Sequence, residues 1–354
     1  MGMLPNSAAV GYLLVAAVSI VLYQQRPFES GFSEIVPIES AVLGAVPVVN
    51  LLADDAETTM DSGLRQFGFF YLKNHGVSQE LIDEQFRQSH ALFALPEDIK
   101  RSMAFVPHLD IGYQGSGDQA LDESSKFKDT KEGYLMTNNA VMQADFELDP
   151  ADPLQGSTLH LPPVTLLPKY EATLRKYAAA MTSTNHKLNK LLFQALGLSE
   201  KDRLQIAKQP FTVVKQLRYQ PDGAGGTNAS ERLGAGAHTD WGSFTILATD
   251  QTPGLQVELD GEWINVPPLE GCLIVNAGDQ INFWTSGMYK SGNHRVQTIS
   301  SKPRYSTAFF TYFDYHAMVV PILAGEGVKT KDYFAFKLCQ SMHLGKESCD
   351  LPGT

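Results

Sequence analysis

The sequence predicts an α+β protein in which a mostly helical first half precedes an antiparallel β second half. Two observations predict this division. Apolar residues recur at helical spacing up to about residue 198, and from residue 212 onward they occur in short alternating runs separated by Gly, Pro and Asp. With 354 residues, of which 43% are hydrophobic, the chain can bury a substantial core.

The charge and the cysteine content narrow the choice of partners and compartment. The formal net charge is −11, from 28 basic and 39 acidic residues, which argues against a surface for phosphate backbones. We therefore expect no nucleic-acid partner. Cys272, Cys339 and Cys349 are too few for a disulfide framework, so we expect thiols in a reducing compartment and a cytoplasmic catalytic domain.

The N-terminal extension, residues 1–44, is strongly apolar at its start. Its first 25 residues contain no Asp, Glu, Lys or Arg. Residues 4–23 approach the length of about 20 residues that crosses a bilayer, and Arg26 after them favours an anchor with a cytoplasmic catalytic domain. Three interpretations of this segment remain open: membrane association through residues 4–23, a cleaved targeting segment, or an apolar extension packed on the domain.

Strands and helices alternate at the start of the first half. Short apolar runs predict strands, and apolar residues at helical spacing with charges between them predict helices. In chain order, the expected elements are a strand at 48–52, a helix at 56–66, a strand at 67–73, a helix at 78–93 and a short helix from Pro96.

Loops and one long helix complete the first half. Residues 103–163 are rich in Gly, Asp and Pro and are expected to form loops. Residues 166–198 have a helical pattern that we expect to be broken near 182–185, where four polar residues follow one another.

The second half is expected to form a closed or double-sheet β unit. Its clearest signal is a hairpin at 255–266, where Asp260-Gly261 is the dipeptide preferred in a tight type I′ turn. Further strands are expected at 244–248, 272–276, 292–300 and 306–313, and a helix at 331–342.

Three residues of this half could hold one metal ion. His238 and Asp240 are two positions apart, so on a strand both side chains point to the same face. His294 lies 54 positions beyond Asp240, at the start of another expected strand. Two histidines and one carboxylate leave three metal positions open, which is typical of non-haem iron(II) oxygenases. Zinc is the competing ion, although its helical HExxH pattern is absent.

An isolated His-x-Asp occurs by chance, so the surrounding sequence decides its meaning. Over roughly residues 45–323 the sequence resembles the isopenicillin N synthase-like family of 2-oxoglutarate and Fe(II)-dependent dioxygenases. The matching blocks are FGFFYLKNHGV (67–77), ALPEDIK (94–100), AHTDWGSFTIL (237–247), PGLQV (253–257), VNAGD (275–279), WTSGMYKSGNHRV (284–296) and RYS (304–306).

The resemblance implies the architecture of the chain. Its fold would be a double-stranded β-helix, or jelly roll, with an N-terminal helical and mixed unit and a long helix packed on the outside. The domains would be the extension at 1–44, an N-terminal dioxygenase unit at 45–165, helical support at 166–210, the jelly roll at 211–325, and a C-terminal helix and tail at 326–354.

The resemblance also implies cofactors. In this family 2-oxoglutarate chelates Fe(II) through its 1-carboxylate and 2-keto oxygen, O2 takes the third open position, and ascorbate is a stimulant. Arg304 would bind the distal carboxylate through two charge-assisted bonds, with Ser306 on the same strand face. Tyr219 is the match to a family tyrosine that contacts this carboxylate. Here Tyr-Gln-Pro stands where the family has Tyr-Pro. The alternative role for Tyr219 is therefore that of an aromatic residue packed in the core.

The primary substrate is expected to be a small molecule, hydrophobic or aromatic, bound by a monomeric enzyme. Family members hold it between the β core and the N-terminal unit, where residues 111–134 would form a cover. Tyr113, Tyr134, Gln256 and Phe310 are the pocket candidates. The last strand departs from the family because Phe313 stands where Pro is common, which adds aromatic bulk.

The expected activity is oxidation of an organic substrate, coupled to decarboxylation of 2-oxoglutarate to succinate and CO2. Hydroxylation is the default outcome, and desaturation and ring formation use the same oxidant. The nearest alternative is an oxidase or cyclase of the same fold that uses iron without 2-oxoglutarate. A non-catalytic binding protein is the alternative from another class, but such a protein would be expected to have lost a metal ligand or Arg304.

Overall fold

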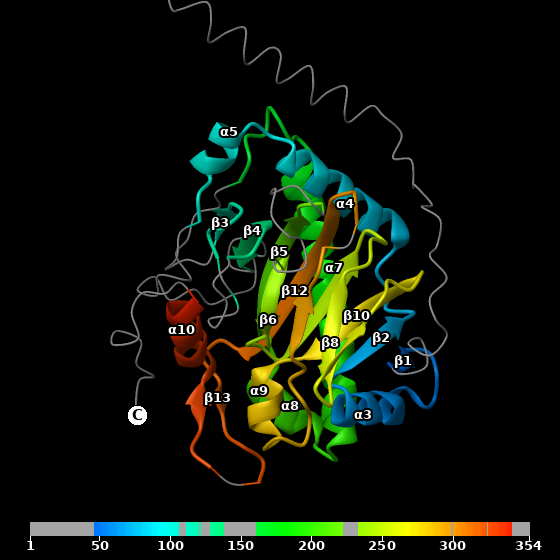
Figure 1. The fold of residues 1–354 in the computed structure, drawn as a ribbon. Coiled ribbons are helices and arrows are strands. Elements are labelled where there is room, and N and C mark those ends of the chain that lie inside the picture. Colours follow the sequence, from blue (N-terminus) through cyan, green and yellow to red (C-terminus); the bar gives the residue numbers. More distant parts are fainter. Residues whose placement is uncertain are drawn as a thin grey trace, which may run out of the picture.

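Two β-sheets face each other at the centre of the structure (Figure 1). The computed structural model describes residues 46–105, 111–119, 121, 128–137, 161–221, 233–298, 300–323 and 325–341. The extension at residues 1–44 lies outside this part of the chain, so membrane association through residues 4–23 stays a prediction. None of the helices in the described ranges is long and apolar enough to cross a membrane.

The larger sheet has eight strands and combines both halves of the sequence. Only its edge pair β1 and β2 is parallel, and the other neighbours pair antiparallel. In spatial order the strands are β1 (Val48–Asn50), β2 (Phe69–Lys73), β10 (Cys272–Ala277), β7 (Phe244–Thr249), β12 (Arg304–Asp314), β5 (Pro210–Tyr219), β4 (Lys131–Thr137) and β3 (Gly112–Gln114).

The smaller sheet closes the other side of the β core. Its four strands are antiparallel, in the order β6 (Ala235–His238), β11 (His294–Val296), β8 (Leu255–Leu259) and β9 (Glu262–Asn265). Leu255 and Val296 of this sheet pack in one apolar cluster with Phe69 and Leu217 of the larger sheet. This two-sheet arrangement, with helices outside, is the jelly-roll α+β fold that the sequence predicts.

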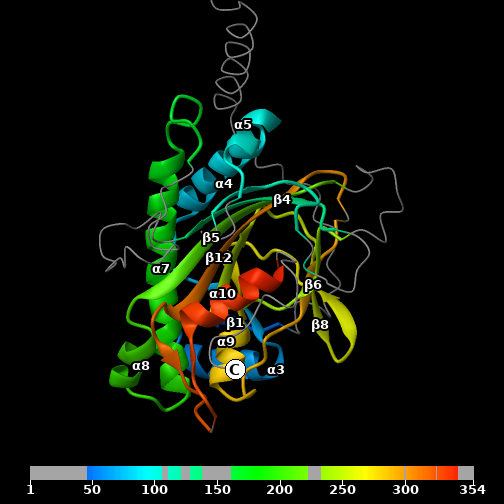
Figure 2. The same ribbon diagram turned by 90° about the vertical axis from the view of Figure 1, so that its left-hand side faces the viewer.

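Helices cover the outer face of the larger sheet. In Figure 2, α4 and α7 lie on one side of this sheet and β6 and β8 on the other. Phe86 of α4 and Tyr177 of α7 pack with Phe70 and Phe309 of the sheet. The complete set of helices among the described residues, of which α4 and α7 lie on this face, is α3 (Ala56–Gln66), α4 (Gln79–Phe93), α5 (Glu97–Ser102), α7 (Tyr170–Ala195), α8 (Glu200–Ile206), α9 (Asp279–Trp284) and α10 (Thr330–Ser341).

Both faces of the larger sheet are buried. Along β2, Phe69 and Tyr71 belong to the cluster between the sheets, whereas Phe70 and Leu72 belong to the cluster beneath the helices. This alternation follows from the period of two in a strand. Such a strand is a continuous apolar run, as the sequence FFYL shows, and gives no sign of which residues face the interior of the β core.

Several expected elements are confirmed. The helix α3 covers the predicted residues 56–66, and α4 begins after Ser78, whose hydroxyl accepts a hydrogen bond from the Leu81 amide at 3.3 Å. Strands β8 and β9 form the predicted hairpin, with Asp260 at φ 51° and Gly261 at φ 85°, as a type I′ turn requires. A small hairpin of β13 (Met318–Val319) and β14 (Val328–Lys329) precedes α10.

The predicted break in the long helix is wrong. Helix α7 runs without interruption from Tyr170 to Ala195. Thr184, within the four polar residues at 182–185, is held in the helix by its surroundings: its hydroxyl lies 3.0 Å from the His75 carbonyl oxygen and 3.1 Å from that of Ala180. Tertiary contacts thus override a weak local propensity.

The prediction that residues 103–163 form only loops is also wrong. The segment contains β3 and β4, and β4 pairs with β5 along its whole length. Its sequence KEGYLMT conceals the strand because its two charged residues are buried in ion pairs. Lys131 pairs with the nearby Asp129, and the Lys100 ammonium lies 2.8 Å from the Glu132 carboxylate. Residues 106–110, 120, 122–127 and 138–160 lie outside the described part.

The cysteines differ in their bonding state. Cys272 is a free thiol, as expected, but Cys339 of α10 is disulfide-bonded, so the expectation of three thiols is corrected there. Pairing depends on the distance and direction between two Cβ atoms, which the sequence does not contain. The argument from thiols to a reducing compartment therefore loses its support.

Candidate active site

The three predicted metal ligands meet at the rim of the smaller sheet. His238 ends β6 and is paired across the strands with His294, which begins β11, and Asp240 follows two residues after His238. We call these three residues the metal triad. Their ligand atoms all lie within 4.8 Å of one another, and Asp240 Oδ1 is 3.8 Å from His238 Nε2 and 3.7 Å from His294 Nε2.

Backbone carbonyls orient both imidazoles. His238 Nδ1 lies 2.7 Å from the Gly236 carbonyl oxygen, and His294 Nδ1 lies 3.0 Å from that of Gly292. When Nδ1 carries the proton and donates to the carbonyl, Nε2 presents its lone pair to the centre of the triad. Fixing the second ring nitrogen in this way is the common device for setting the tautomer of a metal-binding histidine.

Two polar side chains of the larger sheet hold Asp240. The Asn276 amide donates to Asp240 Oδ2 at 2.7 Å, and Thr245 also hydrogen-bonds to the carboxylate. Burial raises the pKa of Asp240, but the two histidines and these hydrogen bonds outweigh it and leave the pKa below its ordinary value. Asp240 is therefore an anion, as a metal ligand must be.

The ionisation state of His238 also suits a metal ligand. Burial and the neighbouring His294 lower its pKa to about 3, although Asp240 opposes the shift. The imidazole is therefore neutral at physiological pH, with its lone pair available. The donor set fits Fe(II), because a carboxylate and two neutral imidazoles on one side of an ion leave positions open toward the cavity.

The predicted cosubstrate residues form a second group on the larger sheet. Arg304 and Ser306 share one face of β12, and Tyr219 is the cross-strand partner of Arg304 on β5. The Arg304 guanidinium donates to the Ser306 hydroxyl at 3.3 Å and to the Thr252 carbonyl at 3.2 Å, and it lies 4.9 Å from the centre of the Tyr219 ring. All three side chains are buried, so an anion held there would meet a fixed, desolvated cation.

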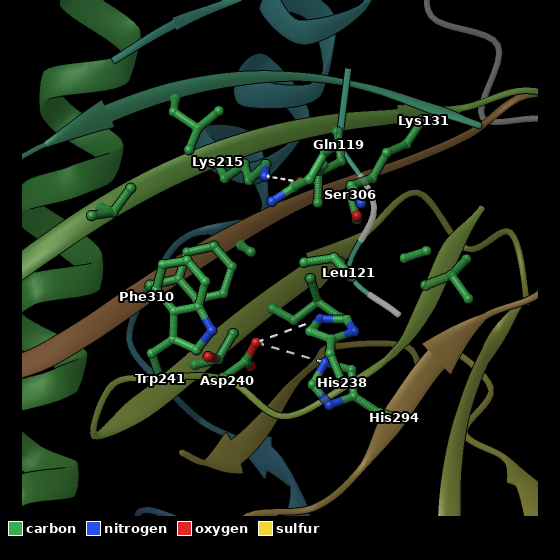
Figure 3. Close-up of a pocket in the computed structure, with 18 of the residues that line it drawn as sticks. Gln119, Leu121, Lys131, Lys215, His238, Asp240, Trp241, His294, Ser306 and Phe310 are labelled. Atoms are coloured by element: carbon green, nitrogen blue, oxygen red, sulfur yellow. Dashed lines mark hydrogen bonds and ion pairs between the residues drawn. The ribbon is translucent and has the colours of Figure 1, made fainter. Parts of the chain in front are cut away.

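One cavity joins the two groups (Figure 3). It lies between the sheets and, with its mouth included, has an empty volume of about 1040 Å³. Its wall includes the metal triad, Arg304, Ser306, Tyr219 and the predicted pocket residue Phe310. Helix α10 lies across one end of the space between the sheets (Figure 2), and its Leu338 is part of the wall.

The other three pocket candidates make their contacts outside this cavity. None of Tyr113, Tyr134 and Gln256 lines the cavity. Tyr113 donates to Glu132 at 2.9 Å, Tyr134 packs edge-on against the Tyr170 ring, and Gln256 bonds to Asn265 at 3.0 Å. Each is one position away from a residue that does line the cavity, and successive side chains of a strand point to opposite faces.

Several cavity residues were missed at the level of sequence. They include Gln114, Gln119, Lys131, Lys215, Trp241, Thr245 and Asn276. Asn276 had a usable signal, because it is a polar residue at the end of the apolar run CLIV. Lys131 had none, and it is buried in an ion pair with Asp129, which also accepts from the Gly236 amide at 2.9 Å.

Comparison with known families gives two matches along the chain. The model of the 2OG-Fe(II) oxygenase superfamily matches residues 210–312, and that of the non-haem dioxygenase in morphine synthesis N-terminal family matches residues 46–156. The clavatol oxidase claD of Penicillium crustosum is 32% identical over 281 residues, covering 73% of this chain and 80% of that protein. A 2-oxoglutarate-dependent dioxygenase of Didymella fabae is 32% identical over 251 residues, covering 69% and 75%.

Solved structures share the fold. A full-length Neurospora crassa protein, in complex with α-ketoglutarate and thymine, superimposes with a TM-score of 0.71 at 22% identity, over 83% of this chain and 96% of that one. At this identity the likeness concerns the fold.

A jelly roll that holds two histidines and a carboxylate beside a buried arginine defines a non-haem iron oxygenase. More narrowly, the chain belongs to the 2OG-Fe(II) oxygenase superfamily. It is an oxidoreductase, a 2-oxoglutarate-dependent dioxygenase that uses iron(II), 2-oxoglutarate and O2.

Proposed function

We propose that this chain oxidises a small organic molecule in the cavity between its two sheets. In this proposal the metal triad holds iron(II), and Arg304, Ser306 and Tyr219 hold 2-oxoglutarate. The observation that carries the proposal is that the triad and the buried Arg304 line the same cavity from opposite sheets. When bound, iron(II) with 2-oxoglutarate and O2 supplies the oxidant, and succinate and CO2 are released.

Arg304 positions the cosubstrate in this scheme. Its guanidinium binds the distal carboxylate, with the Ser306 and Tyr219 hydroxyls beside it. The Thr252 carbonyl fixes the orientation of the guanidinium. Since these groups are buried, little water competes for the carboxylate, and the remaining length of 2-oxoglutarate extends toward the triad.

The primary substrate has an apolar or aromatic body. Phe69, Trp241, Phe310 and Tyr312 contribute aromatic surface to the cavity wall, and such surfaces bind flat or greasy molecules. Hydroxylation is the default outcome, with desaturation or ring formation as variants. Ascorbate is expected to stimulate turnover.

The organisation of the chain is proposed from its sequence. We retain the units 45–165, 166–210, 211–325 and 326–354 and a monomeric state. Membrane association through residues 4–23, with the catalytic domain in the cytoplasm, rests on the apolar sequence of these residues and on Arg26 after them.

Anaerobic titration tests the assignment of Arg304. Adding Fe(II) and then 2-oxoglutarate should give the weak visible charge-transfer band of the chelate. Arg304→Ala should raise the concentration of 2-oxoglutarate needed for this band roughly 10- to 100-fold, because a charge-assisted contact is lost, without an equal change for iron.

Arg295→Ala is the matched control. Arg295 lies on the smaller sheet, 4.1 Å above the Trp263 ring, and does not line the cavity. Its replacement should leave the band unchanged. An equal loss of iron and 2-oxoglutarate binding in Arg304→Ala would indicate general damage. An iron-loaded wild-type enzyme without the band would favour the oxidase that does not use 2-oxoglutarate.

A further inference from the structure

A buried ion pair lies beside the cavity and has no part in the proposed iron and 2-oxoglutarate sites. Lys131 of β4 lines the cavity, and its ammonium pairs with the carboxylate of Asp129, two residues earlier. Lys131 is 5% exposed and Asp129 is 4% exposed. Apolar residues of similar size in place of a buried ion pair are often as stabilising or more so. The pair therefore calls for an explanation other than the stability of the fold.

The Asp129 carboxylate is connected to the metal ligand His238 through a single glycine. Asp129 Oδ1 accepts a hydrogen bond from the Gly236 amide at 2.9 Å, and the Gly236 carbonyl oxygen lies 2.7 Å from His238 Nδ1. The backbone group that orients the imidazole thus belongs to a residue that Asp129 holds in place.

Strand β6 needs such support because of its position in the fold. It has four residues and lies at the edge of the smaller sheet, beside β11, and the pairing of the two strands shifts in register between His294 and Val296. The outer side of an edge strand presents unpaired backbone groups. Asp129 takes up one of these, and the Thr130 amide donates to the Leu233 carbonyl at 3.3 Å, just before β6. The two residues before β4 thereby join the larger sheet to the strand that carries His238.

Asp129 also holds a segment of the cavity wall. The Leu121 amide donates to Asp129 Oδ2 at 3.3 Å, and the Asp129 amide donates to the Gln119 carbonyl at 3.1 Å. Gln119 and Leu121 both line the cavity, and Figure 3 shows Leu121 between Gln119 and His238. The positions of this wall segment and of the strand that carries His238 therefore depend on one residue.

Lys131 makes a buried anion acceptable at this place. Lys131 is the cross-strand partner of Tyr219, which is in turn the cross-strand partner of Arg304. An unpaired carboxylate on Asp129 would lie near the groups proposed to bind the distal carboxylate of 2-oxoglutarate, and the two anions would repel each other. The Lys131 ammonium balances the charge of Asp129, so the carboxylate can hold the backbone without opposing the cosubstrate.

We propose that Asp129 is a positioning residue for both iron and substrate. Its carboxylate fixes the strand that presents His238 and the wall segment that contains Gln119 and Leu121, and Lys131 is its counter-ion. Groups that orient a metal ligand from outside the coordination sphere commonly change metal affinity about 10- to 100-fold. Because Asp129 acts on His238 through Gly236, we expect an effect at the lower end of this range. The inference rests on the proposed function and adds a residue to it.

Two double variants separate the hydrogen bonds of Asp129 from its charge. Both carry Lys131→Met, so that no unpaired charge is left buried. In the leucine variant, Asp129→Leu removes the acceptor for the Gly236 amide. In the asparagine variant, Asp129→Asn keeps a side-chain oxygen that can accept. Anaerobic chelator competition should give a dissociation constant for Fe(II) roughly 10-fold higher than wild type in the leucine variant, and within about 3-fold of wild type in the asparagine variant.

Hydrogen exchange of the iron-free protein is a second readout. The amides of Leu121 and Gly236 should exchange faster in the leucine variant than in the asparagine variant, because only the latter keeps an acceptor for them. This comparison reports on the wall segment and on β6 without iron, 2-oxoglutarate or turnover. It therefore tests the positioning role independently of the chemistry.

Asp314→Leu is the matched control. The Asp314 carboxylate accepts from the backbone amides of Lys208 and Gln209 at 3.1 and 2.7 Å, as Asp129 does from its own partners, but Asp314 does not line the cavity. This variant should lose folding stability and keep the wild-type affinity for Fe(II). If leucine at position 129 prevents folding, Asp129→Ala with Lys131→Met removes the same acceptor and should give the same loss of affinity.

Two results would overturn the role of Asp129. One is a leucine variant that binds Fe(II) as tightly as the wild type. The other is an asparagine variant that loses as much affinity as the leucine variant, because the effect would then come from the charge rather than from the hydrogen bonds. A wild-type protein that binds no Fe(II) would instead refute the proposed function, and the exchange rates of Leu121 and Gly236 would still decide whether Asp129 holds both segments.

Discussion

Asn276 is expected to set the affinity for iron although it does not touch the metal. Its amide donates to Asp240 Oδ2 at 2.7 Å, and only 3% of the residue is exposed. Asn276→Leu keeps the approximate shape and removes this donor. A hydrogen bond to a charged group contributes about 1.5 to 3 kcal/mol, which corresponds to a dissociation constant for Fe(II) roughly 10- to 100-fold higher.

Anaerobic competition with a chromophoric chelator measures this constant. Thr245→Val removes the other side-chain donor to Asp240 and should act in the same direction. Asn282→Leu is the matched control, because Asn282 donates to the Tyr289 carbonyl at 2.7 Å, away from the triad. That variant should lose about 1 kcal/mol of folding stability without a change in iron affinity. Folded Asn276→Leu and Thr245→Val proteins with wild-type affinity would refute the reasoning.

Three further outcomes follow from single contacts. Tyr219→Phe removes the hydroxyl that bonds to Ser306 and Arg304 and should raise the apparent KM for 2-oxoglutarate roughly 3- to 10-fold, whereas Tyr134→Phe, on the opposite sheet face, should not. A Cβ on Gly242 would overlap the Thr311 carbonyl oxygen, so Gly242→Ala should lower the free energy of unfolding by about 1 to 3 kcal/mol in denaturant titrations and weaken iron binding. Burial and the charge of Arg218 lower the pKa of His90 to about 4, below the 6.5 expected in the unfolded chain. The unfolded state therefore takes up this proton first. The contribution to stability is complete above pH 6.5 and is lost as the pH falls toward 4, by up to roughly 3 kcal/mol. His90→Phe should flatten this part of the stability profile, and an unchanged profile would contradict the assignment.

The sequence predicted the metal triad better than it predicted the cavity. His238 and Asp240 share a strand face at a spacing of two, and His294 lies in a recognisable block, so local pattern and resemblance were sufficient. The hairpin at 255–266 was predictable because Asp260-Gly261 selects a turn type without help from the rest of the fold.

Residues that depend on distant partners could not be predicted. Glu132 looks like a loop residue until Lys100, 32 positions earlier, is placed beside it, so β4 was missed. The break expected in α7 failed for the same reason, since Thr184 finds the His75 carbonyl only in the folded chain.

The residues of the cavity wall were hard to predict for a different reason: the sequence does not show which side chains of a buried strand point inward. Where one face of a sheet is solvated, apolar and polar residues alternate and reveal the inward face. The larger sheet is buried on both faces, so Tyr134 beneath the helices and Leu135 in the cavity are equally apolar in sequence. An error of one position then moves a side chain from the substrate to the helical core.

The two sheets contribute different functional groups to the cavity between them. The smaller sheet and the segment after β6 supply the anionic and imidazole donors, whereas Arg304 projects from the larger sheet. The acidic cosubstrate can therefore bridge the two sheets, with its distal carboxylate on the larger sheet and its chelating end toward the triad. The distance between the sheets is thus as important to the proposed chemistry as the charge of Arg304, because a single five-carbon molecule has to reach both groups.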